Sequence, residues 1–177
     1  MWTKPESALL VLAPETEGLV GSFRDRFDHA AAEGVPAHVT LLYPFKAPAE
    51  LDARVLETLG RLFSRFAPFD YALAEPRRFT NVLYLAPEPA APLKALIAAL
   101  VEQFPEYPPY GGIHAEVVPH LSVAQVADAQ KLDAIAAEFA AAAAGRLPVR
   151  ARAAEVALMD NRAGRWAVSG IFRLGAA

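Results

Sequence analysis

The chain contains no cysteine among its 177 residues. This absence excludes disulfide bonds, zinc sites built on thiolates and a cysteine nucleophile. A chain without disulfides suits a reducing compartment, and we expect the protein to be cytoplasmic. Histidine is nearly as scarce, with 4 copies, so a pattern that uses two of them is informative.

Membrane-spanning runs and an excess of basic residues are lacking too. The apolar run at residues 8–13 is too short to cross a bilayer, and Pro14 and Glu15 follow it without a small-residue cleavage pattern. We interpret this run as a buried strand and expect no membrane association. The net charge of −3 and the pI of about 5.8 argue against a broad basic face for long duplex nucleic acid. A short or terminal phosphate held in a pocket is compatible with this charge.

The residues that are abundant predict a folded chain of mixed structure. Hydrophobic residues make up 54% of the sequence and charged residues 21%, which is typical of globular proteins. Segments rich in Val, Leu, Phe and Tyr, bounded by Pro, Gly or Asn, predict strands at 8–13, 38–44, 69–73, 82–86, 120–126, 149–158 and 166–174. Apolar residues at helical spacing predict helices at 15–32, 49–65, 90–103 and 128–144.

The order of these elements repeats along the chain. Each half holds a strand, a helix of about sixteen residues and then two strands with no helix between them, within the boundary error of such assignments. The repeat units run from about residue 38 to 86 and from about 120 to 174. Consecutive strands favour antiparallel pairing, so the predicted class is α+β, with two related lobes in a single domain over residues 1–177.

Two of the expected strands begin with the same pattern, a histidine followed two positions later by a hydroxyl residue: His38 with Thr40, and His120 with Ser122. Residues i and i+2 of a strand face one side, so each strand presents an imidazole and a hydroxyl together. The hydroxyl can donate a hydrogen bond to a phosphate oxygen, and the imidazole exchanges a proton near neutral pH. Around one phosphate, one histidine would deprotonate water and the other would protonate the leaving oxygen. Such a mechanism needs no metal and no organic cofactor.

These motifs, and above all the phrase His-Val-Thr-Leu-Leu-Tyr-Pro-Phe at 38–45, resemble the 2H phosphoesterase superfamily. The resemblance is to its bacterial 2′-5′ RNA ligase-like branch, which includes cyclic phosphodiesterases, and it covers the element order of nearly the whole chain. It implies two pseudo-symmetric lobes of mostly antiparallel sheet, with helices outside and an active-site groove between them. It also implies that His38 and His120 are catalytic and that Thr40 and Ser122 bind the substrate phosphate.

Members of this family act on 2′,3′-cyclic phosphates, on 1″,2″-cyclic ADP-ribose phosphate or on 2′-5′ linkages, and some join RNA ends. The resemblance therefore implies a phosphoesterase of RNA processing, with a small nucleotide or an RNA end as its partner. Few basic residues lie near the two motifs, which argues against tRNA-sized substrates and against ligase activity. We expect a monomer.

Five further residues are candidate substrate contacts. An arginine at 77 or 78 can neutralise phosphate charge through a bidentate contact, and an aromatic ring at 79 can stack on a base. A tyrosine at 43 would line the edge of the groove, and a histidine at 114 lies in a Pro/Gly/Tyr loop that precedes the second motif. The residues concerned are Tyr43, Arg77, Arg78, Phe79 and His114. A solvated turn is the competing interpretation for the arginines.

Other interpretations of the histidines stay open at the level of sequence. Each ring could cap a strand or lie satisfied in the core. His38, His114 and His120 could form a three-histidine metal site, although no His-x-x-x-His pair or carboxylate cluster supports one. A serine hydrolase is disfavoured because Ser122 lacks a Gly-x-Ser-x-Gly elbow. A nucleotide-binding module without turnover is the rival from another functional class, and a partner-binding domain with no ligand is a further one.

Overall fold

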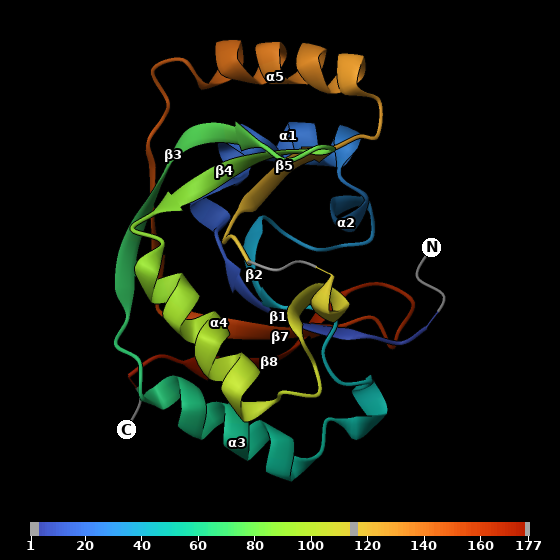
Figure 1. Cartoon of the computed structure of the whole chain (residues 1–177), viewed down its shortest axis with the longest axis vertical. Helices are drawn as coiled ribbons and strands as arrows, with labels where there is room; N and C mark the ends of the chain where they lie inside the picture. Colours follow the sequence, from blue (N-terminus) through green and yellow to red (C-terminus); the bar gives the residue numbers. More distant parts are fainter. Residues whose placement is uncertain (1–3, 114–116, 176–177) are drawn as a thin grey trace.

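The computed structural model describes residues 4–113 and 117–175 and contains two four-stranded antiparallel sheets (Figure 1). The first sheet has the order β2-β1-β7-β8 and the second has the order β5-β4-β3-β6. The first is built from β1 (Ser7–Leu12), β2 (His38–Leu42), β7 (Glu155–Asp160) and β8 (Ala167–Arg173). The second is built from β3 (Phe69–Arg78), β4 (Val82–Glu88), β5 (Leu121–Gln125) and β6 (Val149–Ala153). Every segment predicted as a strand forms sheet, one of them as two separate strands, and the pairing is antiparallel as expected.

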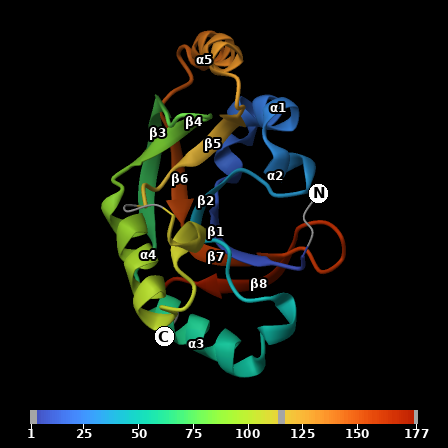
Figure 2. The ribbon, with the colours of Figure 1, turned by 45° about the vertical axis from the view of Figure 1, so that its right-hand side comes forward.

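The helices lie around the sheets, with α5 at one end of the molecule and α3 at the other in Figures 1 and 2. They are α1 (Glu17–Phe27), α2 (His29–Ala32), α3 (Ala53–Ser64), α4 (Ala91–Gln103) and α5 (Ala129–Ala143), with short 3-10 turns η1 (Pro14–Thr16), η2 (Pro48–Glu50) and η3 (Pro109–Gly112). Aspartates cap the starts of α3 and α5: Asp52 accepts a hydrogen bond from the backbone of Val55 at 2.9 Å, and Asp128 accepts one from Lys131 at 3.0 Å. None of the helices described is long and apolar enough to span a bilayer.

Two sequence predictions need correction. The helix expected at 15–32 is divided into η1, α1 and α2. The break between α1 and α2 arises because Asp28 adopts an extended backbone and accepts a hydrogen bond from Ala30 N at 3.0 Å. An aspartate side chain competes with helical hydrogen bonding in this way. The strand expected at 149–158 is two strands, β6 and β7, which pair with β3 and β1 in different sheets. The chain crosses between the sheets at Ala154, a position with no glycine or proline to mark it.

The predicted repeat units therefore each supply strands to both sheets. The unit 38–86 places β2 in the first sheet and β3 and β4 in the second. The unit 120–174 places β5 and β6 in the second sheet and β7 and β8 in the first. This exchange brings β2 and β5 side by side, with Cα atoms within 8 Å. One hydrophobic core joins side chains of both sheets.

The two motif strands alternate as their sequences predict. Val39 and Leu41 of β2 are buried in the core, as are Leu121 and Val123 of β5. The histidine and hydroxyl side chains on the other face of each strand are only partly exposed. Burial of the apolar side chains of each strand stabilises this register, since a slip of one residue would place the histidines in the core.

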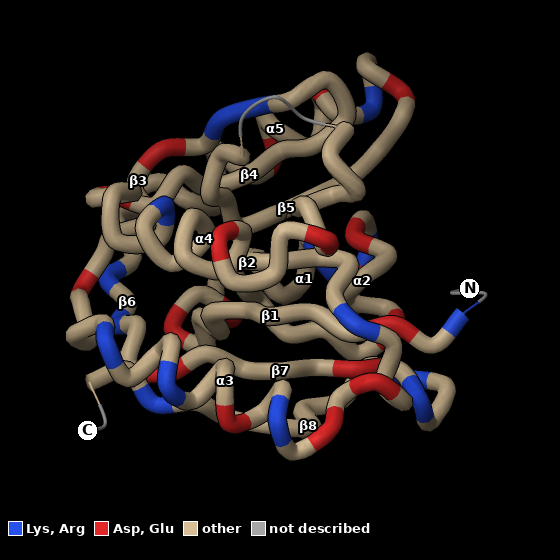
Figure 3. Tube along the Cα trace, turned by 60° about the horizontal axis from the view of Figure 1, so that its bottom comes forward, with Lys and Arg blue, Asp and Glu red and all other residues tan. Residues whose placement is uncertain are grey.

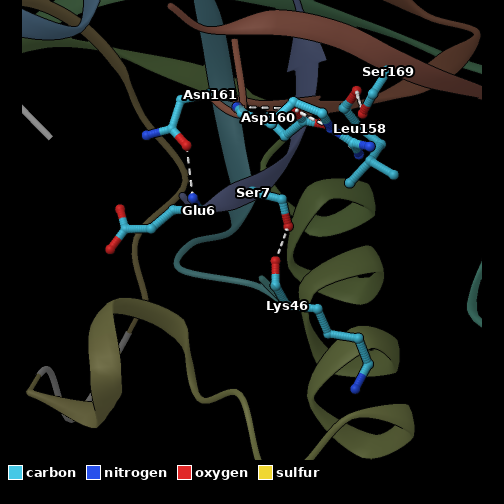
Figure 4. Close-up of polar contacts among 8 residues, drawn as sticks. Glu6, Ser7, Lys46, Leu158, Asp160, Asn161 and Ser169 are labelled. Atoms are coloured by element: carbon cyan, nitrogen blue, oxygen red, sulfur yellow. Dashed lines mark hydrogen bonds and ion pairs between the residues drawn. The ribbon is translucent and has the colours of Figure 1, made fainter. Parts of the chain in front are cut away.

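Polar contacts fix the start of β1 beside the end of β2 (Figure 4). The Ser7 hydroxyl, which is fully buried, donates to the carbonyl of Lys46 at 2.6 Å, and the backbone of Phe45 donates to the carbonyl of Ser7 at 2.9 Å. The backbone of Glu6 donates to Oδ1 of Asn161 at 2.7 Å. These bonds hold the segment that follows the first motif, and their loss would leave buried polar groups unsatisfied.

Candidate active site

A pocket of about 1020 Å³ lies where β2 and β5 meet, and both motifs contribute to its wall. His38 and Thr40 line it from the first sheet, and His120 and Ser122 line it from the second. Because β2 and β5 belong to different sheets, the pocket lies between the two halves of the fold. A smaller pocket of about 430 Å³ near Arg152 contains none of these four residues. The larger one is the candidate active site because it joins the titratable groups.

The backbone holds the two histidines in the same way. Nδ1 of His38 lies 2.7 Å from the carbonyl oxygen of Pro36, and Nδ1 of His120 lies 2.8 Å from that of Val118. A carbonyl oxygen only accepts, so Nδ1 carries the proton in each ring and donates it. In the neutral ring Nε2 is then the nitrogen that can take up a proton. Both rings are thereby set in the tautomer that suits acid–base chemistry at Nε2.

The electrostatic surroundings of His38 favour its neutral form. Burial lowers the pKa of His38 to about 4, and the Pro36 carbonyl opposes this effect. The positive charges of Arg24 and His120 lower this pKa further, whereas the negative charge of Asp28 raises it. His38 is therefore neutral at pH 7, and His120 lies within its electrostatic reach.

Behind His38 lies a buried ion pair that the motif analysis did not include. The side chains of Arg24 and Asp28 are 2% and 4% exposed, and their Nη2 and Oδ2 atoms lie 2.9 Å apart. Arg24 also donates to the carbonyl of Val35 at 3.1 Å, so the buried guanidinium is well satisfied. The two charges largely cancel at the pocket wall, to which Asp28 contributes. Opposite charges four residues apart in a predicted helix were the sequence signal for this pair.

Aromatic rings surround His120 instead. The ring of Phe79 stands perpendicular to the imidazole at 5.1 Å, and the ring of Tyr84 lies 5.5 Å from it. Phe79 and Tyr84 are themselves stacked at 4.3 Å. Tyr84 is the register partner of Ser122 across β4 and β5, so the sheet fixes this cluster. Phe79 remains 36% exposed and lines the pocket beside His120.

Thr40 has a partner that sequence reasoning missed. A hydrogen bond joins its hydroxyl to the phenol of Tyr110, and burial raises the pKa of Tyr110, so the phenol keeps its proton. Tyr110 is the one non-glycine residue with positive φ among those described, at 54°, and its backbone donates to the carbonyl of Tyr43. The Pro/Gly-rich loop is thus tied to the end of β2. Its sequence predicts a loop, but not which side chain turns into the pocket.

Tyr43 and Phe79, two of the candidate contacts, line the pocket. The hydroxyl of Tyr43 donates to the Glu6 carboxylate at 2.7 Å, and its ring packs against Trp166 at 6.1 Å. Tyr43 therefore presents its ring rather than its hydroxyl to the cavity.

The two candidate arginines, Arg77 and Arg78, are not among the residues that line the pocket. Arg77 forms an ion pair with Glu75 at 3.0 Å, and Arg78 forms one with Asp133. Both guanidinium groups therefore bind carboxylates at the surface. His114 lies outside the described residues. Within residues 4–113 and 117–175, no group of three or more metal-ligating side chains is present.

Comparison with solved structures shows the fold. E. coli LigT complexed with 3′-AMP aligns with a TM-score of 0.62 and 16% identity, covering 97% of this chain and 99% of LigT. TT0787 of Thermus thermophilus aligns with a TM-score of 0.57 and 17% identity, covering 96% of this chain and 98% of TT0787. Kluyveromyces marxianus Usb1 aligns with a TM-score of 0.51 and 16% identity, covering 97% of this chain and 98% of Usb1. The predicted α+β fold of two lobes is confirmed.

Sequence comparison identifies the family. No curated protein sequence matches the chain. The family model described as "2′-5′ RNA ligase superfamily" matches residues 12–165, a span that includes both histidine motifs. The resemblance inferred from the motifs is thereby confirmed, and the chain belongs to the 2′-5′ RNA ligase superfamily of 2H phosphoesterases.

Proposed function

We propose that the protein is a metal-independent phosphoesterase that hydrolyses a 2′,3′-cyclic nucleotide, a cyclic phosphate at an RNA end or a 2′-5′ phosphodiester. The observation that carries the proposal is the matched pair of histidines in one pocket. Each donates Nδ1–H to a carbonyl two residues upstream, and each stands beside a hydroxyl. Acid–base catalysis requires two titrating groups around one phosphate, whereas binding of a phosphate without turnover does not require them.

His38 acts as the base and His120 as the acid in this proposal. Nε2 of His38 accepts a proton from water while the water oxygen attacks phosphorus. The bond from phosphorus to one ribose oxygen breaks, and His120 donates its proton to that oxygen. The product is a phosphomonoester, and a proton passed through solvent from His38 to His120 restores the starting state. The pKa of His38, lowered to about 4, supports this assignment because a base must be unprotonated at working pH.

The hydroxyl residues of the two motifs would bind the phosphate, and Phe79 would bind the nucleobase. Thr40 and Ser122 donate hydrogen bonds to the non-bridging oxygens of the phosphate, where negative charge builds up in the transition state. The exposed face of Phe79 offers a surface on which a base stacks, next to His120. E. coli LigT has been solved with 3′-AMP and with ATP, which supports a nucleotide as the ligand of this fold.

The test is a turnover screen with 2′,3′-cyclic nucleotides and 2′-5′-linked dinucleotides, run in EDTA. We expect conversion of at least one substrate to a phosphomonoester by chromatography, and no conversion by the double variant His38→Ala/His120→Ala. Activity that is lost in EDTA and restored by zinc would overturn the metal-independent mechanism. Binding of nucleotides without any product would favour the non-catalytic module, and joining of RNA ends would favour a ligase.

A further inference from the structure

The turn between β7 and β8 carries an arginine that stands beside the pocket. Two arginines, Arg162 and Arg165, flank the tip of this turn, and both are exposed. Nη2 of Arg162 lies 2.7 Å from the carboxylate of Asp160. Arg165 forms neither an ion pair nor a side-chain hydrogen bond with any residue in 4–113 or 117–175. Of the two, Arg165 is therefore the one whose guanidinium is free to bind an anionic ligand.

The guanidinium of Arg165 lies against the backbone of Gly34. A Cβ atom at Gly34, which has a φ of 104°, would stand 3.5 Å from Nε and Nη2 of Arg165 and 3.0 Å from the carbonyl oxygen of Trp166. The backbone of Trp166 donates to the carbonyl of Glu33 at 3.0 Å, so the turn is joined to the segment that follows α2. In Figures 1 and 2 this turn lies on the same side of the molecule as α2. Val35 and Trp166 both line the pocket, so the charge of Arg165 lies at its rim.

The carboxylates near this rim have other partners. Glu33 lies 3.9 Å from Nε2 of His29, and Asp28 is bound to Arg24 in the buried ion pair. The strands β1, β2 and β5 contain no Lys, Arg, Asp or Glu, and their traces carry no charged colour in Figure 3. An anionic group of the substrate that lies away from the histidines would therefore find its positive partner at the rim, in Arg165.

The pocket is large enough for more than the reacting phosphate and its base. Its volume of about 1020 Å³ is at the upper end of the range of roughly 300–1,000 Å³ that is usual for small-ligand sites. In the proposed reaction the phosphate lies between β2 and β5, and the base stacks on Phe79. Ala8 and Leu10 of β1, together with Val35 and Trp166, line the part of the pocket that lies beyond β2. This part is left for another group of the substrate, and it leads to the rim.

We propose that Arg165 binds a second phosphate of the substrate, attached to the 5′ oxygen of the nucleotide whose phosphate reacts. The inference rests on the proposed function for the position of the reacting phosphate. A 2′,3′-cyclic phosphate occupies the 2′ and 3′ oxygens, so the 5′ oxygen is where a further phosphate is attached. Such a group is present in a 5′-phosphorylated nucleotide and, as the last internucleotide phosphate, at an RNA end. The planar guanidinium of an arginine suits it because it can donate two parallel hydrogen bonds to one phosphate.

Ligands that lack a 2′-hydroxyl and a cyclic phosphate test this site without turnover. The binding of 2′-deoxyadenosine 3′-phosphate and of 2′-deoxyadenosine 3′,5′-bisphosphate is measured by calorimetry at low salt. The wild-type protein should bind the bisphosphate about tenfold more tightly, which corresponds to about 1.4 kcal/mol. Arg165→Gln should reduce this ratio of affinities to about twofold or less. A ratio that Arg165→Gln leaves unchanged, or a wild-type protein that does not prefer the bisphosphate, would overturn the inference.

Two further variants separate a local contact from a general effect of charge. Arg54 is an exposed residue of α3 that does not line the pocket. Arg54→Gln makes the same change in net charge as Arg165→Gln and should leave the ratio of affinities unaltered. Arg165→Lys keeps the charge but loses the bidentate geometry, so its ratio should lie between those of Arg165→Gln and the wild type. Equal reductions by Arg54→Gln and Arg165→Gln would overturn a local site at the rim.

A deoxy dinucleotide with a 3′-phosphate identifies the source of the second phosphate, because its 5′ side carries an internucleotide phosphate. If Arg165→Gln weakens binding of the dinucleotide as much as that of the bisphosphate, the site serves RNA ends. If it weakens binding of the bisphosphate alone, the site serves 5′-phosphorylated mononucleotides. If the effect of Arg165→Gln appears but 2′,3′-cyclic AMP is not hydrolysed, the proposed function fails while the phosphate site stands. Hydrolysis of 2′,3′-cyclic AMP without any effect of Arg165→Gln on binding would overturn the inference alone.

Discussion

The His38 side and the His120 side of the pocket use the same backbone arrangement in different surroundings. Each ring donates Nδ1–H to a carbonyl two residues upstream, and each is followed by a hydroxyl at the second position. Beside His38 lies the buried Arg24–Asp28 ion pair, whereas His120 packs against the rings of Phe79 and Tyr84. The duplicated motif fixes where the imidazoles point, whereas the surroundings differ between the two sides, and those of His38 lower its pKa.

This comparison predicts that the two histidines are both required although their roles differ. His38→Ala and His120→Ala should each lower kcat/KM by about 10²–10⁴-fold, because each removes one proton transfer. Steady-state kinetics with 2′,3′-cyclic AMP provides the measurement. Arg77→Ala, which lies outside the pocket, should stay within about twofold of wild type, as a surface substitution does. A loss below about tenfold for either histidine would contradict the two-histidine mechanism.

The hydroxyl residues should matter less, and about equally on the two sides. Thr40→Val and Ser122→Ala remove a donor to the phosphate while they preserve most of the packing. We expect each to lower kcat by about 10–10²-fold, at or below the usual effect of losing one transition-state donor. A rise in KM with unchanged kcat would mean that the hydroxyls bind substrate and transition state equally.

Sequence reasoning was sufficient for the parts of the site that repeat a local pattern. The alternation of buried Val39 and Leu41 with His38 and Thr40 follows from the period of a strand, and the second motif repeats it. The break between β6 and β7 at Ala154 could not be predicted in this way, because the residues on both sides of it have strand propensity and the sequence looks like one continuous strand. That exchange between sheets is nevertheless what sets β2 beside β5.

The contacts that distinguish the two sides depend on tertiary structure. The pair of Arg24 and Asp28 is spaced for a helix surface, yet the fold buries it behind His38. Arg78 is a candidate phosphate ligand in the sequence, and the fold places a carboxylate on α5, that of Asp133, beside it. A sequence shows which groups a segment carries, whereas their ionic partners depend on elements far away in the chain.

The pH dependence should show the asymmetry directly. Protonated His38 cannot act as a base, so kcat/KM should fall as the pH decreases through about 4 rather than through the ordinary histidine value. The same shift affects stability. The pKa of His38 is near 6.5 in the unfolded chain and about 4 in the folded protein, so between these pH values the unfolded state binds a proton that the folded state does not. The free energy of unfolding therefore decreases as the pH falls from about 6.5 to about 4.

Thermal unfolding of His38→Gln, which cannot gain this charge, provides the control for stability. Its melting temperature should fall less than that of wild type between pH 7 and pH 4. An acid limb of kcat/KM near pH 6.5 that His38→Gln alone abolishes would keep His38 as the base but would contradict its lowered pKa. An acid limb that only a substitution of His120 abolishes would pass the base assignment to His120.

The smallest expected effect concerns a contact found on one side only. Tyr110 bonds to Thr40, and no corresponding partner of Ser122 is recorded in the described part of the chain. Tyr110→Phe removes one hydroxyl and should lower kcat by about two- to tenfold, the range of one hydrogen bond. If Tyr110 acts by orienting Thr40, the loss should nearly vanish in a Thr40→Val background and persist in full in a Ser122→Ala background. Equal losses of kcat in both backgrounds would show that Tyr110 acts independently of Thr40. A residue that only supports the fold should lower kcat by the same factor whichever hydroxyl is absent.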